Sequence, residues 1–404
     1  MTQRLGNPIY ARMEQINERI RAGKESGIYP YMQIADEIRD GYVTIDGHQL
    51  LQLSSYAYLD LLNHPKVRQA AQSALTEFGT GTQGARFLSG TTRIHTELEK
   101  TIAQFKKTDE AMVFPSGYVT NLGTISALAG RNDVVICDKL NHASIMDGCA
   151  LSRAKFVRYE HNDMEDLEKV LAEAPKNCGK LIVVDAVFSM EGDIVNLPEV
   201  IRLSRKYDAI LMVDEAHATG VLGETGHGIE EHFGIDDRDA IGVRMGTLSK
   251  AISSLGGYIA GSSKLITYLK HTARSFIFSA ALPPALVAAA KASFEVIAAE
   301  PERVKKLRDN TNYFIQGLAK RGFPTANLQT PIVPIIIGDD ERALIMAKAL
   351  KDEGVFVLPV LSPAVPSGSS RIRATITSGH SFDQLEFAIT AFEKVAKHVG
   401  ILPG

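Results

Sequence analysis

Short apolar runs alternate with longer amphipathic stretches along the middle of the chain. The β-branched apolar runs predict buried strands at Asp133–Cys137, Leu181–Val187, Ala209–Asp214 and Val243–Thr247. Apolar positions at helical spacing predict helices at Pro65–Phe78, Met164–Ala174 and Leu197–Lys206. Strands that alternate with helices in this way indicate an α/β fold built on a mainly parallel sheet.

The pattern changes near residue 285. Two prolines, Pro283 and Pro284, precede an alanine-rich helical stretch at Ala285–Ala299, and a charged helix follows from Pro301. Beyond this point the pattern predicts strands and a last helix at Ile332–Ile337, Val355–Pro359, Arg371–Thr377 and Phe382–His398. The first 45 or so residues resemble a helix followed by an extended arm.

A chain of 404 residues is too long to fold around a single small hydrophobic core, so we expect a large domain with a smaller one beside it. We predict an N-terminal helix and arm over residues 1–55, and a large α/β domain over residues 56–290. A smaller C-terminal α+β domain is predicted over residues 291–404.

Composition and charge exclude several classes of protein. The net charge is −3, so nothing points to a nucleic-acid partner. Three scattered cysteines without a CxxC pair argue for a reducing compartment and against a disulfide frame or a zinc cluster. The polar N-terminus does not resemble a signal peptide, and the apolar stretches are too short to span a bilayer. These features predict a cytoplasmic protein with no membrane span.

Two short motifs match known signatures by chance. The stretch Gly79–Gly84 (GTGTQG) fits the dinucleotide pattern GxGxxG, but a helix precedes it where that pattern requires a strand. The stretch Asp214–His217 spells the DEAH sequence of certain helicases, but the chain has no GxxxxGK[ST] phosphate loop. Neither a dehydrogenase nor a helicase is therefore predicted.

Polar side chains follow directly after the predicted strands. Ligands of open α/β sheets bind outside the carboxyl ends of the strands, so these side chains are candidates for a functional site. The candidates are Asn141, His142, Ser189, Asp214, His217 and Lys250.

Lys250 and Asp214 are the residue types that pyridoxal 5′-phosphate (PLP) requires. A lysine amine forms an imine with the PLP aldehyde, and a carboxylate keeps the pyridine nitrogen protonated so that the ring accepts electrons. The segment GTLSK around Lys250 does not by itself distinguish such a buried lysine from an exposed loop lysine. Asp214 with His217 also leaves a metal site open, although no further ligands follow at metal spacing.

Two further segments suit the rest of such a cofactor. A lone histidine usually has a structural role, and the position of His142 at the carboxyl end of a strand makes ring stacking a second interpretation. Ser116, Gly117 and Tyr118 predict a tight turn that opens a helix, where backbone N–H groups bind phosphate.

Taken together, the motifs resemble the α-oxoamine synthase family of fold-type I PLP enzymes. The resemblance covers about residues 50 to 395, through the motifs SSYAYLDLLNHP, GTGTQGARFLSGT, FPSGYVTN, NHAS, FSMEGD, VDEAHATGVLGETGHG, GTLSK, FIFSAALPP and SRIRATITSGH. Members condense an amino acid with an acyl thioester, release CO2 and form an α-amino ketone. The resemblance implies a homodimer whose active sites lie at the subunit interface.

The resemblance assigns roles around the cofactor ring. Lys250 would bind PLP covalently and later move protons, and Asp214 would pair with the pyridine nitrogen. His142 would stack on the ring and help to orient the substrate. His217 and Ser189 would hydrogen-bond the ring hydroxyl.

The resemblance also assigns the phosphate and carboxylate contacts. The phosphate would be held by Gly117, Tyr118, Thr247 and Ser279 of the partner subunit. Arg373 would bind the amino-acid carboxylate, since a guanidinium matches a carboxylate in bidentate geometry. Arg371 alternates with Arg373 on the same predicted strand face, and the resemblance assigns it no role.

Departures from the family pattern bear on the substrate. Tyr56 stands where several members have an asparagine that contacts the substrate carboxylate, and the chain resembles serine palmitoyltransferases there and at Ser279–Ala280. The loop 361–366 has no arginine where those enzymes have one before two prolines. Ala85 falls where glycine-using members resemble one another in a bulkier β-branched residue. We therefore expect an amino acid with a side chain, serine or alanine, and either an acyl-CoA or an acyl carrier protein thioester.

Two other functions compete with α-oxoamine synthesis. Another fold-type I reaction, such as transamination, would use the same lysine and aspartate. A non-catalytic partner subunit of the same fold would lack one of these two residues, and both are present.

Overall fold

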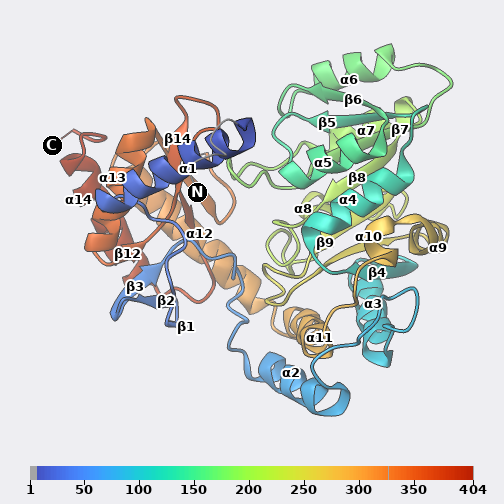
Figure 1. Cartoon of the computed structure of the whole chain (residues 1–404), viewed down its shortest axis with the longest axis horizontal. Helices are drawn as coiled ribbons and strands as arrows, with labels where there is room; N and C mark the ends of the chain where they lie inside the picture. Colours follow the sequence, from blue (N-terminus) through green and yellow to red (C-terminus); the bar gives the residue numbers. More distant parts are fainter. Residues whose placement is uncertain (1–6, 326, 404) are drawn as a thin grey trace.

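The computed structural model describes residues 7–325 and 327–403. The chain forms a large domain around a seven-stranded sheet and a smaller domain beside it (Figure 1). The predicted fold class, a mainly parallel sheet in a large domain plus a smaller C-terminal domain, agrees with this arrangement.

The seven strands of the large sheet lie in the order β4-β10-β9-β8-β7-β5-β6. All run parallel except β10, which is antiparallel to both of its neighbours. Their bounds are β4 Glu110–Phe114, β5 Val134–Asp138, β6 Lys155–Tyr159, β7 Lys180–Asp185, β8 Ile210–Asp214, β9 Val243–Thr247 and β10 Gly257–Gly261. The pattern predicted β5, β7, β8 and β9 to within a residue or two, and β4, β6 and β10 were not predicted.

Helices cover both faces of this sheet, and each face has its own apolar core. Alternate strand residues point to opposite faces, so Ile136 and Val213 pack in one core and Val135 and Met212 in the other. The helices of this domain are α2 Pro65–Phe78, α3 Arg93–Phe105, α4 Gly117–Leu128, α5 Ala143–Ser152, α6 Met164–Glu173, α7 Leu197–Lys206, α8 Ile229–Phe233, α9 Ser263–Thr272, α10 Arg274–Ile277 and α11 Pro284–Ala299.

The smaller domain contains a three-stranded antiparallel sheet in the order β11-β14-β13. Its elements are α12 Glu302–Lys320, β11 Ile332–Gly338, α13 Asp340–Asp352, β13 Pro359–Val360, β14 Ser370–Thr375 and α14 Phe382–His398. Helix α12 leads from the large domain into this one, and helix α1, Pro8–Glu25, lies on the same side of the molecule (Figure 1).

The segment after α1 corrects one expectation. In place of an extended arm the chain forms β1 Glu37–Arg39, β2 Tyr42–Ile45 and β3 His48–Gln52, joined by tight turns. Both turns use an Asp-Gly pair, Asp40–Gly41 and Asp46–Gly47, with positive φ at all four residues. Asp-Gly is a strong sequence signal for this type of hairpin turn, so the pattern contained the information.

The predicted strand Val355–Pro359 is also wrong as a single element. The structure divides it into β12, Val355–Phe356, which pairs with β3, and β13, which pairs with β14. The chain therefore changes sheets between Phe356 and Pro359, and a proline has no N–H with which to continue a ladder.

Candidate active site

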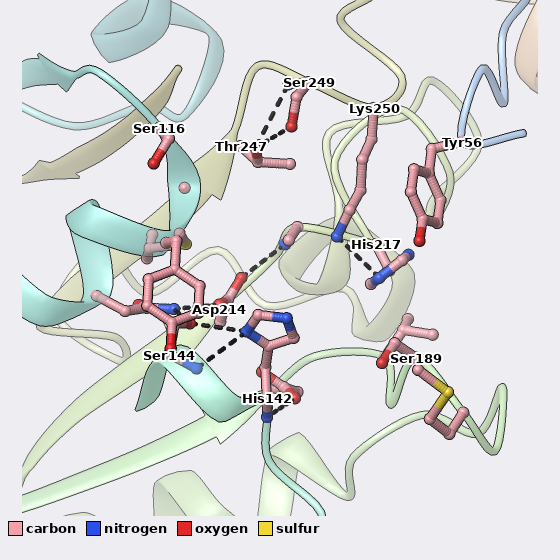
Figure 2. Close-up of a pocket in the computed structure, with 18 of the residues that line it drawn as sticks. Tyr56, Ser116, His142, Ser144, Ser189, Asp214, His217, Thr247, Ser249 and Lys250 are labelled. Atoms are coloured by element: carbon pink, nitrogen blue, oxygen red, sulfur yellow. Dashed lines mark hydrogen bonds between the residues drawn. The ribbon is translucent and has the colours of Figure 1, made fainter. Parts of the chain in front are cut away.

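A cavity of about 320 Å³ opens at the carboxyl ends of β5, β7, β8 and β9 (Figure 2). It contains most of the residues that the sequence analysis selected. The predicted residues that line it are Tyr56, Gly117, Tyr118, His142, Ser189, Asp214, His217, Thr247, Lys250 and Arg373. Ala85 and Ser279 lie outside it.

Lys250 lies in the loop after β9, and its side chain points into the cavity (Figure 2). Its Nζ is 2.8 Å from His217 Nε2. Burial lowers the pKa of Lys250 to about 8, with Arg373 contributing and Asp214 and Asp185 opposing. The amine is therefore far easier to deprotonate than an exposed lysine, as an attack on an aldehyde requires.

The lowered pKa predicts how PLP attachment depends on pH. The free amine is the reactive form, and its fraction rises with pH through about 8, below the 10.5 of an ordinary lysine. We expect the rate at which PLP-free protein takes up PLP to rise with pH and to level off a little above that value. Stopped-flow absorbance at several pH values measures this rate. A rate that keeps rising steeply to pH 10 would mean that the lysine is not buried as described.

Asp214 ends β8 with its carboxylate buried in the cavity wall. Oδ2 accepts a hydrogen bond of 2.8 Å from Asn121 Nδ2, and Oδ1 accepts one of 2.9 Å from the backbone N–H of Ala216. A carboxylate fixed by two donors, with its remaining lone pairs toward the cavity, is suited to bind a protonated ring nitrogen.

His217 is oriented by a residue that the sequence analysis missed. The hydroxyl of Tyr58 is 2.6 Å from His217 Nδ1, and Tyr58 is fully buried. Burial first, and then the positive charge of Lys250, lower the pKa of His217 well below its usual range. A neutral His217 whose Nδ1 accepts from Tyr58 has its proton on Nε2, which faces Lys250 Nζ at 2.8 Å.

The N-terminus of α4 and the loop after β9 form a tight polar corner. A Cβ on Gly117 would lie 2.9 Å from Thr247 Oγ1, and a Cβ on Gly257 would lie 2.8 Å from Gly117 Cα. Thr247 Oγ1 is 2.8 Å from Ser249 Oγ, and both side chains line the cavity. Backbone N–H groups and hydroxyls at a helix N-terminus fit a phosphate group. The Tyr118 hydroxyl donates to Asp147.

Arg373, on β14, extends from the smaller domain to the cavity. Its Nε donates to the Ser189 carbonyl at 2.6 Å and its Nη1 to Thr375 Oγ1 at 3.3 Å. Its Nη2 is buried and has no hydrogen-bond partner among the described residues. An unpaired buried guanidinium nitrogen is costly, and a substrate carboxylate would satisfy it.

Arg371 has a different environment. Its Nη1 donates to the Met190 carbonyl at 2.9 Å and contacts Glu191 at 3.1 Å, and its Nε donates to the Ser369 carbonyl at 3.0 Å. Arg371 does not line the cavity. Its contacts with Met190 and Glu191 join β14 to the loop after β7.

Ala85 and Ser279 lie on adjoining segments outside the cavity of their own chain. Ala85 forms an isolated antiparallel bridge with Ala280, and the Ala281 N–H donates to the Gly84 carbonyl at 2.9 Å. Large apolar side chains are exposed on these segments, Leu88 at 79% and Phe278 at 74%. Exposed apolar groups of this size favour a protein–protein contact at this surface.

No grouping within residues 7–325 and 327–403 places three or more His, Cys, Asp and Glu side chains where they could hold a metal ion. None of the helices in these ranges combines the length and apolar composition needed to cross a membrane.

The family model for aminotransferase class I and II matches residues 48–392. The chain belongs to this family, and its relatives identify it as a PLP-dependent α-oxoamine synthase, an enzyme of the acyltransferase type. The residues around the cavity fit PLP, because they offer an amine of lowered pKa, a fixed carboxylate and a phosphate corner in one place.

The relatives are of two kinds. A serine palmitoyltransferase of Sphingobacterium spiritivorum is 46% identical, over 94% of each chain. An 8-amino-7-oxononanoate synthase of Thermoanaerobacter pseudethanolicus is 44% identical, over 96% of this chain and 98% of the relative. The structure of a serine palmitoyltransferase of Sphingomonas wittichii superposes with a TM-score of 0.94 at 35% identity, covering 98% of this chain and all of the other. The predicted family, fold class and cofactor are thereby confirmed.

Proposed function

We propose that the protein condenses an amino acid with an acyl thioester, releasing CO2 and a free thiol and forming an α-amino ketone. Serine or alanine is proposed as the amino acid, in preference to glycine. The observation that supports this most is the unpartnered Nη2 of Arg373 in the same cavity as Lys250, because it fits an amino-acid carboxylate beside a reactive amine. The serine palmitoyltransferase relative points the same way.

When bound, PLP would supply an electron sink for the electrons released at Cα of the amino acid. The side chains of this protein have the remaining tasks. Asp214 would keep the ring nitrogen of the cofactor protonated, and Arg373 would hold the carboxylate of the amino acid in the cavity that contains Lys250. Lys250 removes the proton as a free amine, which its lowered pKa favours.

The substrate preference rests on two residues. The Tyr56 ring makes cation–π contacts with two side chains of the cavity. Its centroid is 5.3 Å from the Arg373 guanidinium and 5.8 Å from Lys250 Nζ. Ala85 has a small side chain where glycine-using members have a bulkier one, which leaves room beyond Cα. Its place outside the cavity of its own chain means that it would act on the site of a second subunit.

A homodimer is therefore part of the proposal. Ser279 and Ala85 of one protomer would complete the cavity of its partner, and the exposed Leu88 and Phe278 would be buried by the contact. The cytoplasm stays the predicted location, and the acyl group is proposed to arrive on CoA or on a carrier protein.

The direct experiment is a titration of the PLP-loaded protein with glycine, alanine and serine, monitored by visible absorbance and followed by assays with a series of acyl-CoA thioesters. We expect serine or alanine to bind more tightly than glycine and to release CO2 only when thioester is added. Rates with glycine far above those with both other amino acids would contradict the proposed substrate.

Enlarging Ala85 tests the pocket separately. We expect Ala85→Thr to lower kcat/KM for serine or alanine about tenfold or more relative to glycine, since one misplaced methyl in a tight pocket has such an effect. Ala85→Ser, which adds a hydroxyl but no branched methyl, is the matched control and should change the ratio far less. An unchanged ratio in Ala85→Thr would remove Ala85 from the substrate pocket.

A further inference from the structure

Asn121 connects Asp214, the carboxylate expected to contact the cofactor, to Ser144 on helix α5. It lies on α4, is 1% exposed, and its Nδ2 donates to Asp214 Oδ2 at 2.8 Å and to Ser144 Oγ at 2.9 Å. An amide nitrogen only donates, so both of its N–H bonds are used. The reverse orientation would set the amide oxygen against the Asp214 carboxylate, and two acceptors repel. The charge of Asp214 therefore fixes the orientation of Asn121.

This orientation determines where the hydroxyl proton of Ser144 points. Since Ser144 Oγ accepts from Asn121, its own proton is free for His142 Nδ1, which lies 2.8 Å away. The backbone N–H of Ser144 also points at His142 Nδ1, at 3.2 Å, because His142 is the N-cap of α5. Two donors therefore converge on His142 Nδ1, so this nitrogen is an acceptor without a proton.

The other ring nitrogen of His142 faces the cavity. No hydrogen bond within residues 7–325 and 327–403 uses His142 Nε2, and the ring projects among the cavity residues (Figure 2). Burial, and secondarily the charge of Lys250, lower the pKa of His142, although Asp214 opposes the shift. A neutral ring with a bare Nδ1 has its single proton on Nε2.

We propose that Asn121 and Ser144 are positioning residues that hold His142 in one tautomer, with its proton on Nε2, so that His142 presents a hydrogen-bond donor to the cavity. A donor at this position suits the carboxylate oxygens of a bound amino acid, and this second step rests on the proposed function. Asp214 orients the amide of Asn121, this amide orients the Ser144 hydroxyl, and the hydroxyl fixes the tautomer of His142. The tautomer itself follows from the protein's own contacts.

The tautomer can be measured without any reaction. Full-length protein with ¹⁵N-labelled histidine, loaded with PLP, is compared with the His142→Gln variant to assign the two ring nitrogens of His142 by NMR. We expect a protonated Nε2 and an unprotonated Nδ1 in the wild-type protein. A proton on Nδ1, or on both nitrogens at neutral pH, would overturn the proposal whatever the enzyme's substrate.

Ser144→Ala tests the hydroxyl while leaving the contact between Asn121 and Asp214 intact. It should shift part of the His142 population toward the Nδ1-protonated tautomer and raise KM for the amino acid about three- to tenfold, the range for one lost hydrogen bond, with a smaller change in kcat. Ser144→Thr keeps a hydroxyl and should restore both readouts. Ser152→Ala, at the far end of α5, is the matched control for folding.

Asn121→Leu provides the second variant if Ser144→Ala is poorly folded. It removes the donor that orients the Ser144 hydroxyl and should mix the two tautomers. Its matched control is Thr124→Val on the same helix, because Thr124 is equally buried and its hydroxyl has no partner among the described residues. Wild-type tautomer populations in both Ser144→Ala and Asn121→Leu would show that these residues do not position His142. If the tautomer shifts as expected in these variants but KM is unchanged, the proposed positioning of His142 stands. Only its proposed contact with the substrate is then contradicted.

Discussion

Lys250→Ala is expected to abolish the covalent attachment of PLP and to lower the rate of condensation by about 10⁴-fold, because it removes both the nucleophilic amine and the group that moves the Cα proton. The fold should be retained, since Lys250 is in a loop and its Nζ contacts only His217 among the hydrogen bonds of the described chain. The measurement is the visible absorbance of PLP-loaded protein after extensive dialysis, with rates from a thiol-release assay.

The control for this variant is Lys264→Ala on α9, an exposed lysine that does not line the cavity. It should keep wild-type absorbance and activity. Borohydride treatment of wild-type protein should fix the mass of PLP to the peptide that contains GTLSK. A visible band that persists in Lys250→Ala after dialysis would assign the attachment to another lysine.

Asp214→Asn is expected to leave the protein folded and to slow Cα–H exchange by about 10²- to 10³-fold, the usual cost of removing one electrostatic group from an active site. A neutral amide cannot keep the pyridine nitrogen protonated, so the ring would accept electrons poorly. Exchange of the Cα hydrogen of serine or alanine in D2O, monitored by proton NMR, measures this step alone.

Asp185→Asn is the informative comparison. Asp185 is the register partner of Asp214 on the neighbouring strand and is also buried, with Oδ2 accepting from the His142 N–H at 2.8 Å. Burial first, and then the Asp214 charge, raise the pKa of Asp185 well above its usual range, which favours its neutral form. Because the charged form of Asp185 is disfavoured relative to an ordinary carboxylate, its removal should slow exchange less than about tenfold. Equal losses in the two variants would show that the ring charge does not depend on Asp214 specifically.

The sequence pattern located the site because the relevant strands are fully buried. A parallel strand covered on both faces is a nearly continuous apolar run, so β8 is visible in the sequence and its end is marked by its first polar residue, Asp214. Strand β9, VRMGT, contains an arginine and is less regular, and Lys250 follows its last residue by three positions. Strand β10 was harder to recognise because its sequence, Gly257–Gly261, includes two glycines where backbone approaches closely.

The supporting residues could not be found in the same way. Tyr58 and Asn121 are far in sequence from His217 and Asp214, and only the folded chain brings these pairs together. Ser144 is two residues from His142, but its contact with Asn121 also depends on the fold. Each is of a type that occurs in any buried polar environment, and no local spacing distinguishes it. Residue type and strand position therefore predict the groups that meet the cofactor, whereas their partners depend on tertiary contacts.

The central claim is that this cavity joins an amino acid to an acyl thioester with loss of CO2. The most direct measurement supplies serine or alanine labelled with ¹³C in the carboxyl group, together with acyl-CoA thioesters of graded length. We predict ¹³CO2, free CoA and an α-amino ketone in equal amounts. Conversion of PLP to its aminated form with the label retained in a keto acid would instead identify the protein as an aminotransferase and contradict the account.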